Sequence, residues 1–530
     1  MRESDVSIFA TLFMALSSSH FSRSMKFTRP RSLAFLQKKA AFNISLLFVG
    51  LFFAVPAHAQ TNLWSPAPFA SNQAKTAHTP DLPDLEKGLL LQLDVTAMQQ
   101  VGKTAQKEFS DTRNATTIID LPLPDGSFQK FKIWESPLME PELAAKFPHI
   151  KTYILKGVDD PFASGRMSVS PDEFGAFFTS HQFGQDVFIR KALKNSTALY
   201  LSYWGKYDPT LEQPFHCLWE GSPDTHDTLQ QHRMAGSNET GDVLRVFRLA
   251  MTIPGKLSEN NGWTTKAQAM ASLVAFLSQL NAIFERDLSV RFVLPARQDD
   301  IIFVSSAADP FTALGGGEAA NENIAVINQL IGQEGFDVGL IFVTGACCAA
   351  GKPTICGEYK AWNFSAFWSL RVTAHEIGHQ FDGDHTWTSC GPSNNGQFGT
   401  NEYGSGTSIL SYANICGIDN ILPVGDERYF GVYSQIQMTN HINARTCYKT
   451  LETGNHIPVS SVPASGFYIP VSTPFELVGT ASDADGDHLT YSWEQVNIRN
   501  IDFTASNISI QTPPAPADGD VPIARIFNPS

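Results

Sequence analysis

Three histidines and one glutamate stand at a spacing that suits metal-dependent chemistry. His375 and His379 are four residues apart, so on a helix their imidazoles share one face and can bind one cation at about 2.0–2.1 Å. Glu376 directly follows the first of them and would lie beside the metal without binding it. Zinc lowers the pKa of a bound water to about 7, and a carboxylate there can take its proton and pass it to a leaving amine. The pattern predicts hydrolysis of peptide bonds.

A third ligand is expected from a turn that follows this helix. Asp382 and Gly383 can end the helix in a left-handed conformation, which would return His385 to the metal and leave a fourth position for water. Two other interpretations remain open: a solvated helix face with incidental histidines, and a purely structural zinc site. Glu376 disfavours both, because a glutamate beside two histidine ligands serves hydrolysis better than folding.

The elements around this motif indicate an α/β domain over residues 243–452. The expected elements are a strand over 244–253, a helix over 264–285, strands over 288–294, 301–304 and 338–343, and a helix over 321–331 between the last two. Thr264 or Thr265 is a suitable N-cap for the first helix. Strands that alternate with helices in this way predict a sheet covered by helices.

The preceding residues have a different pattern. Between 117 and 191, short alternating apolar runs are separated by proline, glycine and aspartate, which predicts an antiparallel β-rich region. Residues 60–80 are polar and rich in alanine, proline and threonine, so we expect an exposed leader there. Residues 222–242 have almost no periodic apolar positions, which is typical of a linker open to proteolysis.

Composition limits the classes of function. The chain has 530 residues, of which 43% are hydrophobic, so it can form several cores. Its formal net charge of −14 gives no electrostatic support for binding nucleic acid or an anionic membrane. No stretch after the N-terminal apolar run is expected to span a membrane, and the oligomeric state is left open.

An N-terminal signal peptide is expected over residues 1–59. The apolar run 40–55 follows two lysines and leads into Ala57-His58-Ala59, which predicts cleavage after Ala59. The run is shorter than the roughly 20 residues that span a bilayer. Met25, followed by several basic residues, is an alternative start. We therefore expect a secreted protein with no stable membrane insertion after cleavage, in which disulfides can form.

The motif HEIGHQFDGDH resembles the zinc signature of the metzincins, and particularly the adamalysin/reprolysin-like bacterial branch. The resemblance implies that His375, His379 and His385 bind zinc and that Glu376 is the general base. Two departures stand out. Asp382 occupies the position of a family glycine, and Leu410 in GSGTSILSYANICG occupies that of the methionine in the family's methionine turn. Leucine preserves the volume of an apolar floor under the metal.

The resemblance extends to other segments and implies further roles. Tyr412 matches a tyrosine that contacts the metal or the oxyanion in some metzincins. Residues 60–242 resemble the propeptide of exported bacterial enzymes, and 453–530 resemble the start of a PKD-like or immunoglobulin-like β-sandwich that is not complete. The whole implies a multidomain zymogen: a β-rich propeptide, an α/β metzincin zinc endopeptidase acting on polypeptides, and a C-terminal β module. The alternatives are an inactive metzincin scaffold that serves as an adhesin, and a zinc hydrolase of non-peptide amides.

Seven cysteines raise a question of latency. Six lie between 347 and 447, an even number that allows three disulfides, and adjacent Cys347 and Cys348 are expected to have different partners. Cys217 is left over at the end of the propeptide, where its thiolate could occupy the fourth zinc position. A buried structural cysteine is the alternative. Farther along, three aspartates can offer oxygen ligands to calcium or form a solvated turn: Asp483, Asp485 and Asp487.

Overall fold

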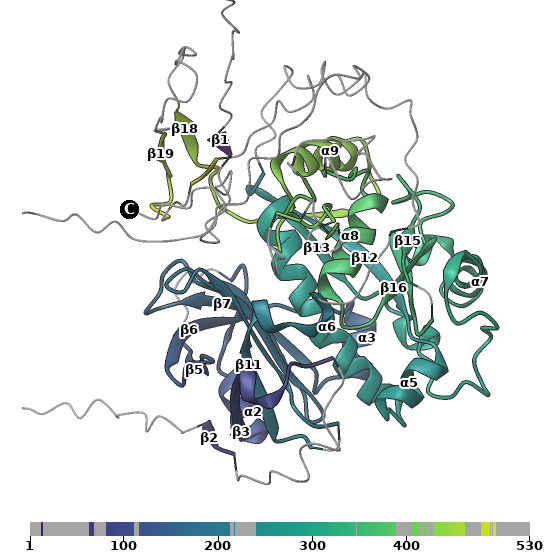
Figure 1. Cartoon of the computed structure of the whole chain (residues 1–530), viewed down its shortest axis with the longest axis horizontal. Helices are drawn as coiled ribbons and strands as arrows, with labels where there is room; N and C mark the ends of the chain where they lie inside the picture. The colour runs from purple at the N-terminus through teal and green to yellow at the C-terminus, as the bar shows by residue number, and fades with distance from the viewer. Residues whose placement is uncertain are drawn as a thin grey trace, which may run out of the picture.

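The computed structural model describes residues 12–13, 63–67, 81–110, 116–194, 196–211, 217, 240–345, 347–387, 402, 404–412, 416–417, 420–421, 428–461, 479–487, 489 and 491–493. The expected signal peptide lies outside these residues except for 12–13, and the expected linker 222–242 lies outside them except for its last three residues. Two sheets dominate the described part of the chain, and one long helix lies between them (Figure 1).

The first sheet has ten strands, in the order β2-β3-β11-β10-β9-β8-β7-β6-β4, with β5 also paired to β6. The strands are β2 (Trp64–Pro66), β3 (Gly88–Leu93), β4 (Gln106–Lys107), β5 (Ile118–Pro122), β6 (Phe128–Glu135), β7 (Lys151–Gly157), β8 (Ser164–Val169), β9 (Phe174–Ser180), β10 (Gln185–Lys191) and β11 (Leu199–Trp204). Helices α2 (Val95–Gly102) and α3 (Pro141–Lys146) and 3-10 turns at Leu85–Lys87, Gly205–Tyr207 and Pro209–Leu211 join them. All pairs except β4–β6 are antiparallel, so the expected antiparallel region is confirmed.

The expected leader at 60–80 is wrong in one segment. Trp64 lies in β2, pairs with Leu93 of β3 and is only 4% exposed. Its ring packs edge-on against Phe174 and Tyr200. A three-residue strand with one large apolar side chain has no periodicity to detect, so only the sheet that it completes reveals it.

The second sheet has six strands, in the order β13-β12-β14-β16-β15, with β17 also paired to β12. The strands are β12 (Val243–Thr252), β13 (Val290–Val293), β14 (Val338–Val343), β15 (Ala349–Ala350), β16 (Asn363–Ala366) and β17 (Lys449–Glu452). The helices are α5 (Gly255–Asn261), α6 (Lys266–Leu288), α7 (Gly316–Leu330), α8 (Leu370–Gln380) and α9 (Val432–Asn443), with 3-10 turns at Gln298–Ile301 and Gln333–Gly335. The strand expected at 301–304 is wrong: this segment forms the end of a 3-10 turn and a single bridge from Ile302 to Ile253.

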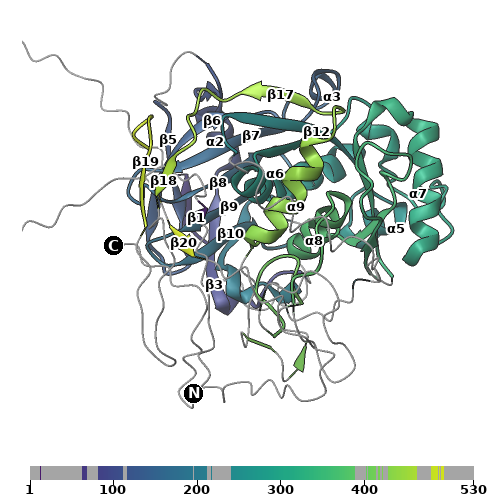
Figure 2. The same ribbon diagram turned by 90° about the horizontal axis from the view of Figure 1, so that it is seen from above.

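Helix α6 lies between the two sheets and is buried on nearly all sides (Figures 1 and 2). Thr265 caps its N-terminus in a capping box with Gln268, which settles the choice between the two threonines. By length and composition α6 could cross a membrane, contrary to expectation, but 83% of its most apolar window is buried inside the protein. Its apolar surface is explained by two neighbours, because it serves as a core helix for both sheets.

The two sheets share one hydrophobic core. Phe177 of β9 and Phe188 of β10 belong to the same buried cluster as Phe276 and Phe284 of α6 and Phe342 of β14. Helix α7 lies on the other side of the second sheet, away from the first (Figure 2). The N-terminal region is therefore a packed layer of the molecule.

Buried ion pairs join the two regions at α6. Arg166 of β8 contacts Glu285 of α6 at 2.7 Å, and Arg291 of β13 contacts the same carboxylate at 2.5 Å. Arg291 also forms a bidentate pair with Glu108 of the N-terminal region, at 2.6 and 2.9 Å. Both guanidinium groups are almost fully buried, with side-chain exposures of 1% and 6%. Each buried charge depends on a partner from the other region.

The C-terminal residues provide limited support for the expected β module. Strand β17 joins the second sheet, β18 (Val459–Ser461) pairs with β19 (Thr480–Ser482), and β20 (Ser492–Trp493) pairs with β1 (Leu12–Phe13). The other strands expected after 454 lie outside the described residues in whole or in part. The β-sandwich stays a prediction.

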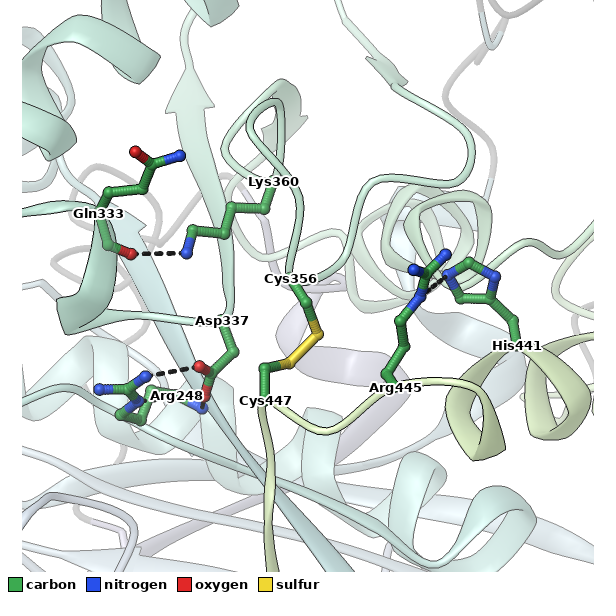
Figure 3. The surroundings of a disulfide bond; sticks show 8 residues. All are labelled: Arg248, Gln333, Asp337, Cys356, Lys360, His441, Arg445 and Cys447. Carbon is green, nitrogen blue, oxygen red and sulfur yellow. Dashed lines mark hydrogen bonds and ion pairs between the residues drawn. A yellow bond between two sulfur atoms is a disulfide. The ribbon is translucent and has the colours of Figure 1, made fainter.

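Disulfides close the second region around the histidine motif. Cys356 is joined to Cys447, 91 residues away (Figure 3). The covalent loop that this bond closes contains helix α8 and all three histidines. Cys416 is also disulfide-bonded. Cys347 is joined to Cys348, which contradicts the expectation of separate partners. That expectation weighed only the small ring, whereas in the fold both side chains pack into one apolar cluster with Trp387 and Tyr412.

We expect Arg291→Met to destabilise the full chain by about 3–5 kcal/mol, because two partly buried carboxylates lose the buried cation that they share. The free energy of unfolding from urea titration measures this loss. Arg297→Met is the matched control, since Arg297 is 57% exposed in its pair with Asp300 and should contribute less than about 1 kcal/mol. Equal effects of the two substitutions would contradict the role of the buried network.

Candidate metal centre

Helix α8 positions two of the predicted ligands and the predicted base. It follows β16 closely, and every one of its residues is buried. The Nε2 atoms of His375 and His379 are 3.0 Å apart, because residues four apart face the same side. Nε2 of His385 lies 3.2 Å from each of them. The three nitrogens therefore converge on one point.

Backbone carbonyls orient two of these rings. Nδ1 of His375 lies 2.7 Å from the carbonyl oxygen of Ile409, and Nδ1 of His379 lies 2.8 Å from that of Gly383. A carbonyl oxygen can only accept, so each Nδ1 carries the proton and each Nε2 presents a lone pair. Hydrogen bonds from Nδ1 to a carbonyl oxygen fix the tautomer whose Nε2 can bind a metal.

The turn after α8 returns His385 to the other two histidines. Asp382 has φ of 80°, and the N–H of Gly383 donates to the carbonyl of Gly378 at 2.9 Å. The left-handed residue is thus Asp382, the position at which the sequence departs from the family glycine. Aspartate is among the few residues that adopt this conformation readily, so the departure preserves the turn.

Leu410 forms the floor beneath this turn. It is fully buried, and a Cβ at Gly383 would lie 2.4 Å from its Cδ1 atom. A Cβ at Gly378 would lie 3.1 Å from Cδ2 of the same leucine. Glycine is needed at 383 because the leucine side chain and the turn touch closely. The position expected for the family methionine is therefore occupied by a packed apolar side chain.

Burial keeps the three imidazoles neutral. Loss of solvent lowers the pKa of His379 to about 4 and lowers the pKa values of His375 and His385 well below the usual range. Neighbouring imidazoles add to this effect at His375 and His385. Neutral imidazole is the form that binds metal.

Glu376 lies against Cys217. Its Oε2 accepts from Sγ of Cys217 at 3.5 Å, whereas its buried Oε1 has no hydrogen-bond partner. Burial raises the pKa of Glu376 to about 8, and the hydrogen bond from Cys217 opposes this increase. An unsatisfied buried carboxylate oxygen is costly, and this one is free to accept a hydrogen bond from a further polar group.

Cys217 is brought to the three histidines across 158 residues of sequence from His375. Its Sγ and the ligand atoms of His375, His379 and His385 all lie within 4.8 Å of one another. Tyr412 donates its hydroxyl to the carbonyl of Cys217 at 3.3 Å, and its ring lies 4.8 Å from the His385 ring. The structure thus brings Cys217 and Tyr412 to the three histidines and Glu376, while Leu410 lies in the neighbouring apolar core.

The three histidines fit a zinc ion. A tetrahedral ion with Zn–N bonds of about 2.0–2.1 Å needs nitrogens about 3.3–3.4 Å apart, close to the 3.0–3.2 Å observed. The donor set is three neutral imidazoles, with a thiol able to provide the fourth ligand. Three histidines and an open fourth position are typical of catalytic zinc sites.

The aspartates suggested for calcium form a separate turn. Oδ1 of Asp483 accepts the N–H groups of Asp485 and Asp487 at 2.8 and 2.9 Å, and Asp485 also contacts His456. The three carboxylates lie within 4.8 Å of one another. Both earlier interpretations, a calcium site and a solvated turn, are compatible with this geometry.

Three residues that hold the turn were not predicted from the sequence. Lys352 and Asp384 form a buried ion pair, and Gln437 of α9 binds the same aspartate. No motif includes them, because they come from three distant segments. Asp384 stands between Gly383 and His385, and this adjacency was the one available signal.

Comparison with known families agrees with the geometry of this site. Residues 243–440, which are 198 of the 530 residues, match the family described as metallo-peptidase family M12B, reprolysin-like. The matched residues include α8, the three histidines and Glu376. The match supports a reprolysin-like metallopeptidase. Metallopeptidases of this family use zinc and act on polypeptides.

Other comparisons add nothing to the assignment. No curated protein matches the chain. A solved structure described as the structure of a chaperone-substrate complex aligns at 15% identity and a TM-score of 0.22. The alignment covers 38% of this chain and 36% of that one. A likeness of this degree carries no argument about fold or function.

We expect Leu410→Met to leave zinc affinity within a few-fold of the parent, because the exchange preserves the volume of the floor. Leu410→Ala should instead destabilise the protein by about 2–5 kcal/mol, since it leaves a cavity under the turn. Competition with a chelator and thermal unfolding measure the two effects. Loss of zinc in the methionine variant would show that Leu410 has another role.

Proposed function

We propose that the protein is a secreted zinc-dependent endopeptidase that is synthesised as a zymogen. The observation that carries this proposal is the convergence of three neutral imidazoles with a buried carboxylate beside them. The family match over 243–440 supports the same class of enzyme. Export rests on the signal-peptide pattern of residues 1–59 and on the use of disulfides.

The residues divide the chemistry between them. His375, His379 and His385 would hold zinc, which when bound supplies a Lewis acid for the scissile carbonyl and lowers the pKa of a water to about 7. Glu376 takes a proton from the attacking water and returns it to the amine that leaves. Its Oε1 atom suits this role, because it is buried without a hydrogen-bond partner.

Cys217 is proposed to hold the zymogen inactive. Its thiolate would take the fourth metal position, and its Sγ already contacts Oε2 of Glu376. Its carbonyl also accepts the hydroxyl of Tyr412, so one residue engages both side chains that would face a substrate. The shared core of the two sheets supports this contact, because the N-terminal region is fixed against α6.

The finer assignments rest on resemblance. We propose residues 60–242 as the propeptide, 243–452 as the catalytic domain and 453–530 as part of a β module. Maturation would begin with a cut in the linker near 222–242. The intact base, buried beside the three histidines, disfavours the inactive adhesin. The family match over 243–440 favours peptides over other amides as substrates.

We expect Glu376→Gln to retain one zinc per chain and to lose at least about 100-fold in hydrolysis of a denatured protein, because the water loses its proton acceptor. His385→Ala should instead lower zinc occupancy, since it removes a ligand. Both are compared with the parent after processing, by metal analysis and by product release. A fully active glutamine variant would refute the assignment of the base.

We expect the uncleaved Cys217→Ser chain to hydrolyse protein before processing, because a hydroxyl is a far poorer zinc ligand than a thiolate. With cobalt in place of zinc, the parent precursor should show a thiolate-to-metal charge-transfer band that the serine variant lacks. A serine precursor as silent as the parent, with the same cobalt spectrum, would exclude Cys217 as the inhibitory ligand.

A further inference from the structure

We propose that Lys352, Asp384 and Gln437 form a clamp that fixes the turn carrying His385, and that they are positioning residues for the third metal ligand. This inference rests on the proposed zinc site and concerns its geometry. None of the three has an atom among the predicted zinc ligands. Their side chains act on the segment between Gly383 and Thr386, through its backbone.

Lys352 reaches this turn from the second sheet. It follows β15, and its side chain is only 5% exposed. Its Nζ atom contacts Oδ1 of Asp384, which is 2% exposed, and lies 3.5 Å from Oδ1 of Asp382. One buried ammonium group therefore lies against both aspartates of the turn, including the one with φ of 80°.

Gln437 holds the same aspartate from α9. Its Nε2 atom donates to Oδ2 of Asp384 at 2.5 Å, and its Oε1 atom accepts the N–H of Asp384 at 3.1 Å. This reciprocal pair fixes both the side chain and the backbone of one residue. Both carboxylate oxygens of Asp384 are thus satisfied, one by a cation and one by an amide.

The clamp acts on His385 through Asp384, the residue before it in the chain. The N–H of Gly383 is bound to Gly378, and the N–H of Thr386 is bound to the carbonyl of Leu410 at 3.1 Å. Asp384 and His385 are the two residues between these anchored positions, and Asp384 comes directly before the ligand. Because the peptide unit is planar, fixing Asp384 restricts the direction in which the imidazole of His385 leaves the chain.

A buried ion pair is a weak source of net stability, because desolvation offsets most of its attraction. Its geometric demands are strict, however, and outer groups that orient a ligand typically change metal affinity by 10–100-fold when mutated. The clamp also compensates for aspartate in place of glycine at position 382, because the half-buried carboxylate of Asp382 lies 3.5 Å from the ammonium group of Lys352. The structure therefore assigns metal retention to this cluster.

The test is the zinc affinity of the full chain, measured by competition with a chelator. We expect Lys352→Met and Asp384→Asn each to weaken zinc binding by about 10–100-fold and to shift the visible spectrum of the cobalt-loaded protein. The double variant should lose little more than either single variant, because both remove the same contact. Lys352→Arg keeps the cation and should restore most of the affinity.

Lys360→Met is the matched control. Lys360 is also a buried lysine of this region, but its Nζ atom binds the carbonyl of Gln333 at 2.6 Å, away from the turn (Figure 3). Thermal unfolding of the metal-free variants separates instability from misplacement of the ligand. If Lys352→Met fails to fold, Lys352→Arg and Asp384→Asn still provide the comparison.

The outcomes distinguish this inference from the proposed function. Zinc affinity and cobalt spectra within two-fold of the parent in folded Lys352→Met and Asp384→Asn would overturn the clamp and leave the peptidase assignment intact. A parent chain that binds zinc tightly but cleaves no protein even after processing of the linker would overturn the peptidase assignment and leave the clamp testable. A parent that binds no zinc would overturn both.

Discussion

The structure depends on the need to direct three imidazole lone pairs at one point inside a buried site. Burial keeps the rings of His375, His379 and His385 neutral, and carbonyl acceptors at Ile409 and Gly383 orient the first two. A buried polar group is costly unless it has a hydrogen-bond partner. Helix α8, the floor and the turn after it are arranged to provide those partners.

The same demand explains the departures from the metzincin pattern. The glycine that the metzincin pattern has at position 382 is found one residue later, at 383, where the Leu410 side chain leaves no space for a Cβ. Asp382 then adopts the left-handed conformation and is compensated by Lys352 at 3.5 Å. Leu410 in the floor and Asp382 in the turn therefore depend on each other: the leucine requires glycine at 383, and the aspartate then takes the left-handed position beside Lys352.

The N-terminal region contacts this site through more than Cys217. It shares a core with α6 and contributes Arg166 and Glu108 to a buried network with Glu285 and Arg291. The first sheet, which packs against α6, therefore stabilises the position of Cys217 beside the histidines. Separation of the regions would leave apolar surface and unpaired charge on α6, so a single cut in the linker would leave most of the attraction in place.

Sequence alone determined the elements with strong periodicity and the spacing of the ligands. Alternation located β6 to β10, helical spacing located α6, and HEIGH placed two ligands and a base on one helical face, because these signals depend on neighbours in the chain. Tertiary structure alone decided the two-residue strand β15, the pairing of Cys347 with Cys348 and the contacts of Lys352 and Gln437 with Asp384. Those features join segments far apart or too short for a period, and their energies exist only when the chain has folded around them.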